Sequence, residues 1–129
     1  MSDRAVYDLF SVEGKRALVT GGSAGLGRAM AEALVSGGAR VAIVGRSERV
    51  VAVAGETGAI PLQADLADRS QALVLMDRAV EALGGLDVVV NNAGTQARHP
   101  AEEFPRSDGD LVLSVNLAAV WSLALAAGR

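Results

Sequence analysis

The chain has 129 residues, of which 50% are hydrophobic and 21% charged, and 12 basic against 15 acidic residues give it a formal net charge of −3. This length fits one domain, which buries enough apolar surface to need no disulfide or metal staple. The lack of cysteine excludes thiolate catalysis, zinc–thiolate sites and iron–sulfur clusters, and a single histidine leaves little room for a histidine metal site. The mild acidity argues against a nucleic-acid-binding surface, which needs clustered positive charge.

The N-terminal residues, up to Phe10, lack the apolar stretch of a signal peptide. No apolar run approaches the ~20 residues that span a bilayer. The longest run, Leu117 to Ala127, is interrupted by a serine. The sequence therefore predicts a cytoplasmic protein that does not enter a membrane.

Short apolar runs alternate along the chain with longer stretches of helical period. Runs with little polar alternation are typical of strands covered on both faces, and four are predicted here: residues 16–20, 40–44, 59–62 and 87–90. Four helices are predicted between and after them: residues 25–35, 47–54 (with Ser47 as N-cap), 68–83 and 107–127. This alternation predicts an α/β fold, a doubly wound parallel sheet of Rossmann type in three α/β/α layers, with strand order 3-2-1-4.

The first segment that carries chemistry is the run from Thr20 to Gly27, which joins the first strand to the first helix and reads Thr-Gly-Gly-Ser-Ala-Gly-Leu-Gly. Glycines let the backbone turn sharply and approach a pyrophosphate, and the start of a helix favours an anion. A Walker A loop is excluded, because Arg28 and Ala29 stand where it has Lys and Ser/Thr. The glycine spacing also differs from the usual G-x-G-x-x-G fingerprint. The alternative is a turn that packs strand on helix without a ligand.

The Thr-Gly-x-x-x-Gly-x-Gly spacing resembles the short-chain dehydrogenase/reductase family, and three later segments occur in that family's order. They are Asp65-Leu66 after the third strand, Asn91-Asn92-Ala93-Gly94 after the fourth, and Asn116 in the last helix. The resemblance spans nearly the whole chain. It implies that residues 1–129 form a single NAD(P)-binding Rossmann domain, the N-terminal part of an oxidoreductase and incomplete at its C-terminus.

The resemblance also implies a role for each motif. In the glycine run it assigns cofactor binding to Thr20, Gly21, Ser23, Gly25, Leu26 and Gly27. It places Asp65 and Leu66 at the adenine ring, and it places Asn92, Ala93 and Gly94 on the nicotinamide side. It gives Asn116 a catalytic role in a water and proton relay behind the family's lysine. Structural alternatives are a turn cap for Asp65, turn formation for Asn91 and Asn92, and a helix bend or interhelical bond for Asn116.

Arg46 bears on the choice of cofactor. Where an NAD-binding fold carries an acid after its second strand, this chain has Gly45 and then Arg46. A missing carboxylate and a guanidinium favour NADP, because a charge-assisted bond to the 2′-phosphate contributes about 1.5 to 3 kcal/mol. NADP-preferring members often add a second basic residue in the glycine run, where this chain has Ser23 and Ala24. NADP is therefore preferred and NAD retained, and the alternative for Arg46 is a solvated side chain or a pair with Glu48.

The family's catalytic residues are missing from this sequence. The family uses a Tyr-x-x-x-Lys pair with an upstream serine to move the hydroxyl proton while hydride passes to or from nicotinamide. Here Tyr7 and Lys15 are the single tyrosine and the single lysine, and both precede the glycine run. We therefore expect these residues to be inactive alone and to belong to a longer NAD(P)-dependent enzyme that interconverts an alcohol and a ketone. The alternative is an inert nucleotide-binding or interaction module.

Substrate and partners are indicated only by the C-terminal third. Residues 91–104 look similar to sugar-acid members such as gluconate 5-dehydrogenases, and Arg98 is a candidate for binding a substrate carboxylate, with a solvated loop arginine as the alternative. His99 is expected to be a surface residue. The helix over 107–127 is apolar almost all round, and in the family it builds a dimer interface, so we expect a homo-oligomer, a dimer or tetramer, through it. We expect no metal, nucleic-acid or membrane partner.

Overall fold

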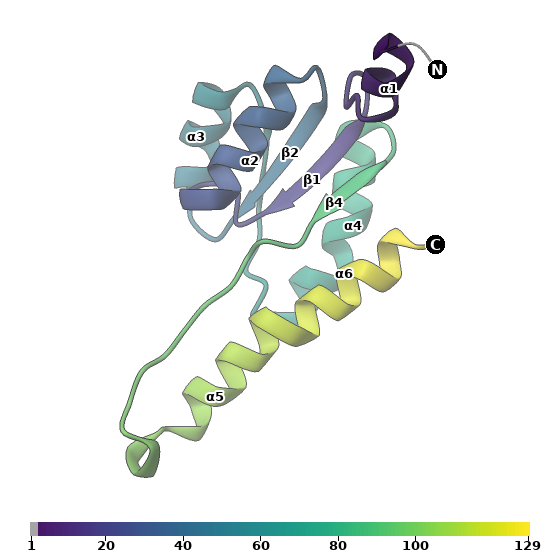
Figure 1. The fold of residues 1–129 in the computed structure, drawn as a ribbon. Helices are drawn as coiled ribbons and strands as arrows, with labels where there is room; N and C mark the ends of the chain where they lie inside the picture. The colour runs from purple at the N-terminus through teal and green to yellow at the C-terminus, as the bar shows by residue number, and fades with distance from the viewer. Residues whose placement is uncertain (1–2) are drawn as a thin grey trace.

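The computed structural model describes residues 3–129, and a four-stranded parallel sheet with the order β3-β2-β1-β4 forms its centre (Figure 1). The strands are β1 (Arg16–Thr20), β2 (Arg40–Gly45), β3 (Ile60–Gln63) and β4 (Val88–Val90). Each predicted strand is present to within one residue at either end. The predicted strand order and the doubly wound Rossmann-type fold are confirmed.

Helices connect the strands and close the chain. They are α1 (Asp3–Leu9), α2 (Gly25–Ser36), α3 (Arg49–Thr57), α4 (Arg69–Leu83), the short 3-10 helix η1 (Ala101–Glu103), α5 (Arg106–Leu113), the π-helical η2 (Ser114–Ala119) and α6 (Val120–Ala127). The prediction of Ser47 as an N-cap is wrong, because α3 begins after Glu48, which makes no side-chain capping bond. Asp68 does cap α4, accepting a hydrogen bond from the amide of Ser70 at 2.9 Å.

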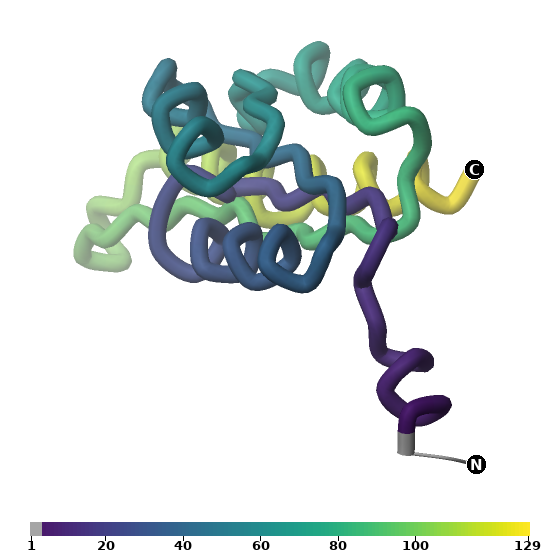
Figure 2. Tube along the Cα trace, turned by 90° about the horizontal axis from the view of Figure 1, so that it is seen from above, coloured from purple at the N-terminus to yellow at the C-terminus, as the bar shows by residue number. Residues whose placement is uncertain are grey.

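Two apolar cores lie on opposite faces of the sheet. One face packs against α2 and α3 through Ala17, Val19, Val41, Ile43, Ala31, Val50, Val53 and Ala54. The other packs against α4 and the C-terminal helix through Leu18, Ala42, Val44, Leu62, Leu75, Ala79, Ala119 and Leu123. Successive residues of β1 and β2 alternate between the two cores, as the period of a strand requires. This confirms the three-layer arrangement, and α1 stands apart from it (Figure 2).

The segments α5, η2 and α6 form one long helix that extends past the sheet (Figure 1). Its inner side packs through Val115, Ala119 and Leu123, whereas Leu117 and Trp121 are more than half exposed. Over residues 106–127 the helix has 22 residues and an 18-residue window of mean hydropathy 1.7, 11% of it buried. By length and composition alone, this helix is long and apolar enough to cross a membrane, which differs from our expectation. Its charged residues cluster in the first two turns, so the rest of the helix is apolar. Core helices of soluble proteins meet the same criterion.

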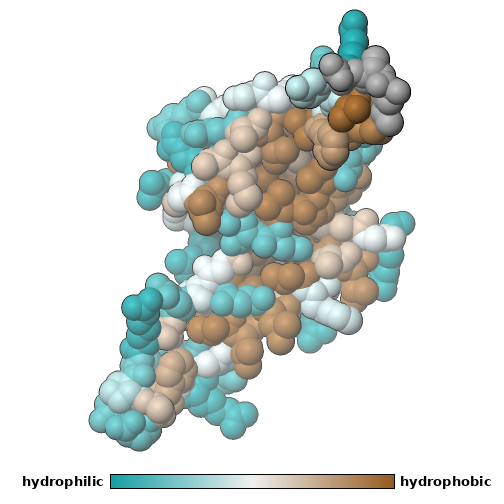
Figure 3. Space-filling model, viewed as in Figure 1, coloured by the Kyte–Doolittle hydropathy of each residue, from teal (hydrophilic) through white to brown (hydrophobic). Residues whose placement is uncertain are grey.

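Apolar colour covers much of the face over β4 and the long helix (Figure 3). In β4, all three valines are only half-buried, and β1 is the strand's sole partner among the residues that the structure describes. An edge strand of this kind leaves unpaired backbone groups and apolar side chains in solvent. Another strand or protein surface could therefore pack against this face.

Candidate functional site

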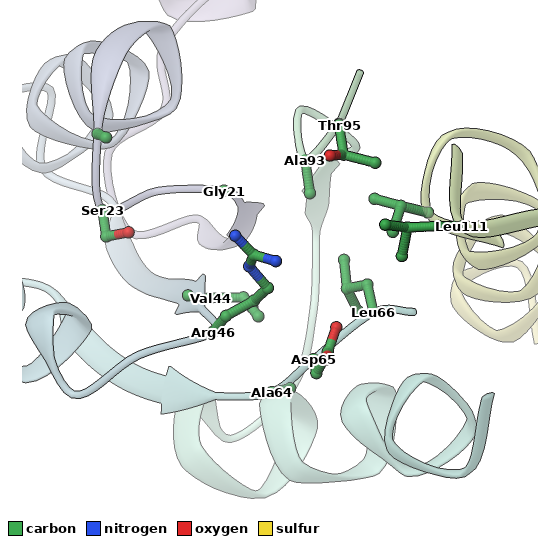
Figure 4. Close-up of a pocket in the computed structure, with 14 residues that line it drawn as sticks. Gly21, Ser23, Val44, Arg46, Ala64, Asp65, Leu66, Ala93, Thr95 and Leu111 are labelled. Atoms are coloured by element: carbon green, nitrogen blue, oxygen red, sulfur yellow. The ribbon is translucent and has the colours of Figure 1, made fainter. Parts of the chain in front are cut away.

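A cavity of about 290 Å³ lies where the strands of the sheet end. Such a position, outside the carboxyl ends of parallel strands, is where doubly wound folds bind ligands. Seven predicted site residues line it: Gly21, Ser23, Arg46, Asp65, Leu66, Ala93 and Gly94. They come from four separate loops that the sheet brings together (Figure 4).

The glycine turn forms one wall, packed tightly against the end of β4. Gly21 has φ +64°, and a Cβ there would lie 3.0 Å from the Cα of Ala93. A Cβ on Gly27 would overlap the Gly21 carbonyl oxygen and the side-chain Nδ2 of Asn92. No side chain caps the start of α2 at Ala24. The amides of the first helical turn are thus left without a side-chain acceptor, beside the cavity that Ser23 and Ala24 line.

Thr20 and Asn92 face each other behind this wall. The Thr20 hydroxyl accepts hydrogen bonds from the amides of Asn92 (3.1 Å) and Ala93 (3.0 Å) and donates to the Val90 carbonyl (3.3 Å). In return the Asn92 carboxamide donates to the carbonyls of Thr20 (3.1 Å) and Gly21 (3.3 Å). Neither residue lines the cavity. Their side chains hold the ends of β1 and β4, and hence the glycine turn, in place.

Arg46 stands at the end of β2, and its guanidinium points into the cavity on the side of Gly21 and Ser23 (Figure 4). None of the ion pairs formed among residues 3–129 involves Arg46, so the pair with Glu48 is not formed. Beside it, a Cβ on Gly45 would lie 2.9 Å from the Ser23 hydroxyl and 3.0 Å from the Val50 Cβ. A larger residue at position 45 would therefore displace Ser23 or Val50. Arg46 is the charged residue on this side of the cavity.

Asp65 follows β3 on the floor of the cavity and is half-buried. Its Oδ1 accepts a hydrogen bond from the amide of Ala67 at 3.0 Å, which is the turn cap that the sequence left open. Its own amide donates to the side-chain oxygen of Gln71 at 2.8 Å. Among the described residues nothing bonds to Oδ2, so one carboxylate oxygen remains available to a ligand.

Asn116 lies in the π-helical segment and is paired with the loop after β4. Its Oδ1 accepts from the amide of Thr95 at 2.8 Å, and its Nδ2 donates to the Thr95 carbonyl at 2.9 Å. Thr95 lines the cavity, whereas Asn116 does not. The side chain thus forms a helix-to-loop bond, close to the structural alternative of an interhelical bond. A π-helical turn also displaces the backbone ladder, a feature common at functional sites.

Other predicted site residues stand outside the cavity. Leu26 is 78% exposed, and Gly25 lies beside it at the outer edge of the glycine turn. Arg98 is exposed in the loop after β4, donates to the side chain of Gln96 at 3.3 Å and does not line the cavity. His99 is at the surface, as predicted, and pairs with Asp108 at 2.7 Å.

Sequence reasoning missed the two lining residues that come from the last helix. Leu111 and Val115 are four positions apart, on one side of α5–η2, and border the cavity opposite the glycine turn. Their spacing marks a common face of the helix but not the loop that it meets. With Leu66 they make one end of the cavity apolar.

The family model for short chain dehydrogenases matches residues 15–128. The chain belongs to the short-chain dehydrogenase family. It is 38% identical over 128 residues to a gluconate 5-dehydrogenase of Gluconobacter oxydans, covering 95% of this chain and 50% of that protein. The chain thus spans about half the length of the curated relatives it matches.

Solved structures agree with this membership. The chain superposes on a short-chain dehydrogenase of Burkholderia cenocepacia in complex with NADP with a TM-score of 0.87, at 43% identity over 92% of this chain and 51% of that one. For a structure from Beutenbergia cavernae, described as a putative NAD(P)-dependent gluconate 5-dehydrogenase with bound NADP, the TM-score is 0.85 at 41% identity, covering 92% of this chain and 49% of that one. The Rossmann-type sheet of this short-chain dehydrogenase chain is thus shared with NADP-bound proteins.

Proposed function

We propose that this chain is the NADP-binding domain of an oxidoreductase that interconverts an alcohol and a ketone. The proposal rests on one observation, the set of groups at the cavity where the strands end. Within residues 3–129, these are the uncapped start of α2, the guanidinium of Arg46, which forms no ion pair, and the carboxylate of Asp65, which has one oxygen without a hydrogen bond. These are the donors and acceptors that a dinucleotide requires. The related proteins named above are all described as dehydrogenases, so the inert-module alternative lacks support.

Each part of NADP has candidate partners among the residues in and beside the cavity. The first amides of α2 would receive the pyrophosphate, and Arg46 with the Ser23 hydroxyl would receive the 2′-phosphate. Asp65 Oδ2 and the apolar side chains of Leu66 and Val115 would hold the adenine. Ala93 and Gly94 would leave backbone exposed toward the nicotinamide half. When bound, the cofactor supplies or accepts the hydride.

Proton transfer needs groups that this chain does not bring to the cavity. Tyr7 lies in α1, 77% exposed, and Lys15 immediately precedes β1, at the opposite end of the sheet from the cavity. In the proposed enzyme, a tyrosine and a lysine outside these residues move the hydroxyl proton. Asn116 is kept as the proposed relay residue, with its side chain bonded to the peptide groups of Thr95. The 129-residue chain alone is then inactive.

The proposed substrate is a small alcohol or ketone of the sugar-acid class, acted on in the cytoplasm. The match to a gluconate 5-dehydrogenase supports the class. Arg98 does not line the cavity, but it is exposed three residues after Thr95, which does, and it stays our candidate for the substrate carboxylate. The exposed apolar side of the long helix, with Leu117 and Trp121, supports assembly into a homo-oligomer.

The test measures cofactor binding and turnover in the full-length protein. Binding of NADP should be tighter than that of NAD, and Arg46→Ala should weaken NADP binding about tenfold while leaving NAD binding nearly unchanged. Reduced-nicotinamide absorbance is followed with gluconate-type acids and with simple secondary alcohols. Equal losses for both cofactors in Arg46→Ala would refute the 2′-phosphate role, and absence of turnover with every alcohol would refute the oxidoreductase.

A further inference from the structure

Gln63, the last residue of β3, is bonded to the backbone of Arg46. Its side-chain Nε2 donates to the Arg46 carbonyl oxygen at 3.0 Å. Its own carbonyl accepts a hydrogen bond from the guanidinium of Arg78 on α4 at 2.9 Å. A chain of hydrogen bonds thus runs from α4 through the end of β3 to the residue just after β2.

Among the described residues, this bond is the one side-chain hydrogen bond that Arg46 makes. The β2–β3 ladder reaches Gly45, whose carbonyl accepts from the amide of Ala64 at 3.0 Å, and it stops there. Arg46 itself is exposed and forms no ion pair within residues 3–129. The position from which its long side chain extends therefore depends on how its own peptide group is held.

We infer that Gln63 is a positioning residue that aims Arg46 at the 2′-phosphate and so contributes to the preference for NADP over NAD. The inference rests on the proposed function. An unrestrained arginine loses rotamer and backbone freedom when it binds a phosphate, and a backbone held in advance reduces that loss. NAD has no phosphate at this place, so Gln63 affects its binding little.

A merely structural role for Gln63 would produce a different result. Its side chain is exposed, and the Arg46 carbonyl can bond to water when the glutamine is removed. Loss of the amide therefore leaves no buried cavity and no buried unsatisfied group. A general weakening of the fold would lower the affinities for NADP and NAD together, whereas loss of positioning lowers only the first.

The experiment uses the full-length protein and measures dissociation constants for NADP and NAD by titration calorimetry. Gln63→Met keeps the length of the side chain without its donor, and Gln63→Val, a good strand former, is the second variant if the first fails to fold. We expect NADP binding to weaken by about three- to tenfold and NAD binding to change by less than about twofold. Gln96→Met removes a glutamine whose side chain, within residues 3–129, bonds to Arg98 alone, and it should leave the ratio of the two constants unchanged.

The double variant separates this inference from the proposed function. If Gln63 acts through Arg46, then Gln63→Met in the Arg46→Ala background costs no further NADP affinity. If Arg46→Ala alone lowers both affinities equally, the 2′-phosphate role of Arg46 fails and the inference fails with it. If Arg46→Ala is selective for NADP but Gln63→Met changes neither affinity, or both equally, only the positioning role of Gln63 is overturned.

Discussion

The carboxamide of Asn116 is paired with the peptide groups of Thr95 in the manner of a backbone ladder. The Thr95 amide donates to Oδ1 at 2.8 Å, and Nδ2 donates to the Thr95 carbonyl at 2.9 Å, across a sequence separation of 21 residues. Thr95 lines the cavity, so the pair connects the long C-terminal helix to the cavity wall. Any movement of this helix is thus transmitted to the loop after β4.

Asn116→Ala should loosen this loop. Two net hydrogen bonds contribute about 1 to 3 kcal/mol, and the higher helix propensity of alanine offsets about half a kcal/mol. We therefore expect the free energy of unfolding to fall by about 1 to 2 kcal/mol in urea titrations. The Thr95 amide should exchange with deuterium faster than in the unaltered protein.

Asn91→Ala is the matched control, because Asn91 is exposed and its side chain makes no hydrogen bond among the described residues. Its unfolding free energy and its Thr95 exchange rate should stay the same. Unchanged Thr95 exchange in Asn116→Ala would contradict the importance of the pair.

Thr20→Val removes a buried hydroxyl without changing the shape of the side chain. Thr20 is 1% exposed, and its oxygen accepts from the amides of Asn92 and Ala93. These donors lose their partner, and each such loss costs about 1 to 3 kcal/mol when the group is out of reach of water. We expect a loss of about 2 kcal/mol in urea unfolding and weaker binding of both cofactors. Thr20→Ser keeps the hydroxyl and should retain most of the stability; if serine costs as much as valine, the hydrogen bonds are not the cause.

Gly27→Ala tests the close approach of α2 to the end of β4. Alanine normally stabilises a helix relative to glycine by about 1 kcal/mol, but here its Cβ would overlap the Gly21 carbonyl oxygen. We expect the free energy of unfolding to fall by about 2 kcal/mol or more, with a displaced glycine turn and weakened cofactor binding.

Gly55→Ala in α3 is the control, because a Cβ there has nothing within 4 Å, and it should instead raise the free energy of unfolding by about 1 kcal/mol. A stable, tightly binding Gly27→Ala protein would show that the turn can shift freely.

The ion pair between Arg16, at the start of β1, and Asp87 should make the stability of the fold depend on pH in the acid range. The hydrogen bonds of the Arg16 side chain and backbone to this carboxylate, at 2.8 to 3.1 Å, lower the pKa of Asp87 from 3.8 to about 2. A lowered pKa in the folded state means that the pair stabilises the fold above pH 4, and that this contribution is lost as the pH falls from about 4 towards 2.

Asp87→Asn should remove that part of the pH dependence. Thermal unfolding midpoints measured between pH 2 and pH 6 should converge for the two proteins at the acid end and separate above pH 4. Parallel curves over the whole range would mean that Asp87 titrates at its usual pKa in the folded protein.

The sequence by itself determined the architecture of this protein. Apolar runs too short for helices, separated by helical periods, predict parallel strands joined by right-handed crossovers. The glycine run between the first strand and the first helix predicts the doubly wound order 3-2-1-4, which the sheet has. The glycine run, Asp65 and the segment from Asn92 to Gly94 all follow strands. Because the carboxyl ends of parallel strands meet at one edge, much of the cavity could be predicted without coordinates.

Only the tertiary structure decided what the individual side chains do. Thr20 and Asn92 carry the motif but bond to each other behind the cavity, and Asn116 bonds to Thr95. The bond from Gln63 to Arg46 has no sequence signal at all. Periodicity identifies the face of a strand or helix on which a residue lies, but a hydrogen-bond partner many residues away depends on the register and packing of the elements that carry both groups. Those are settled by the whole fold, not by the local sequence.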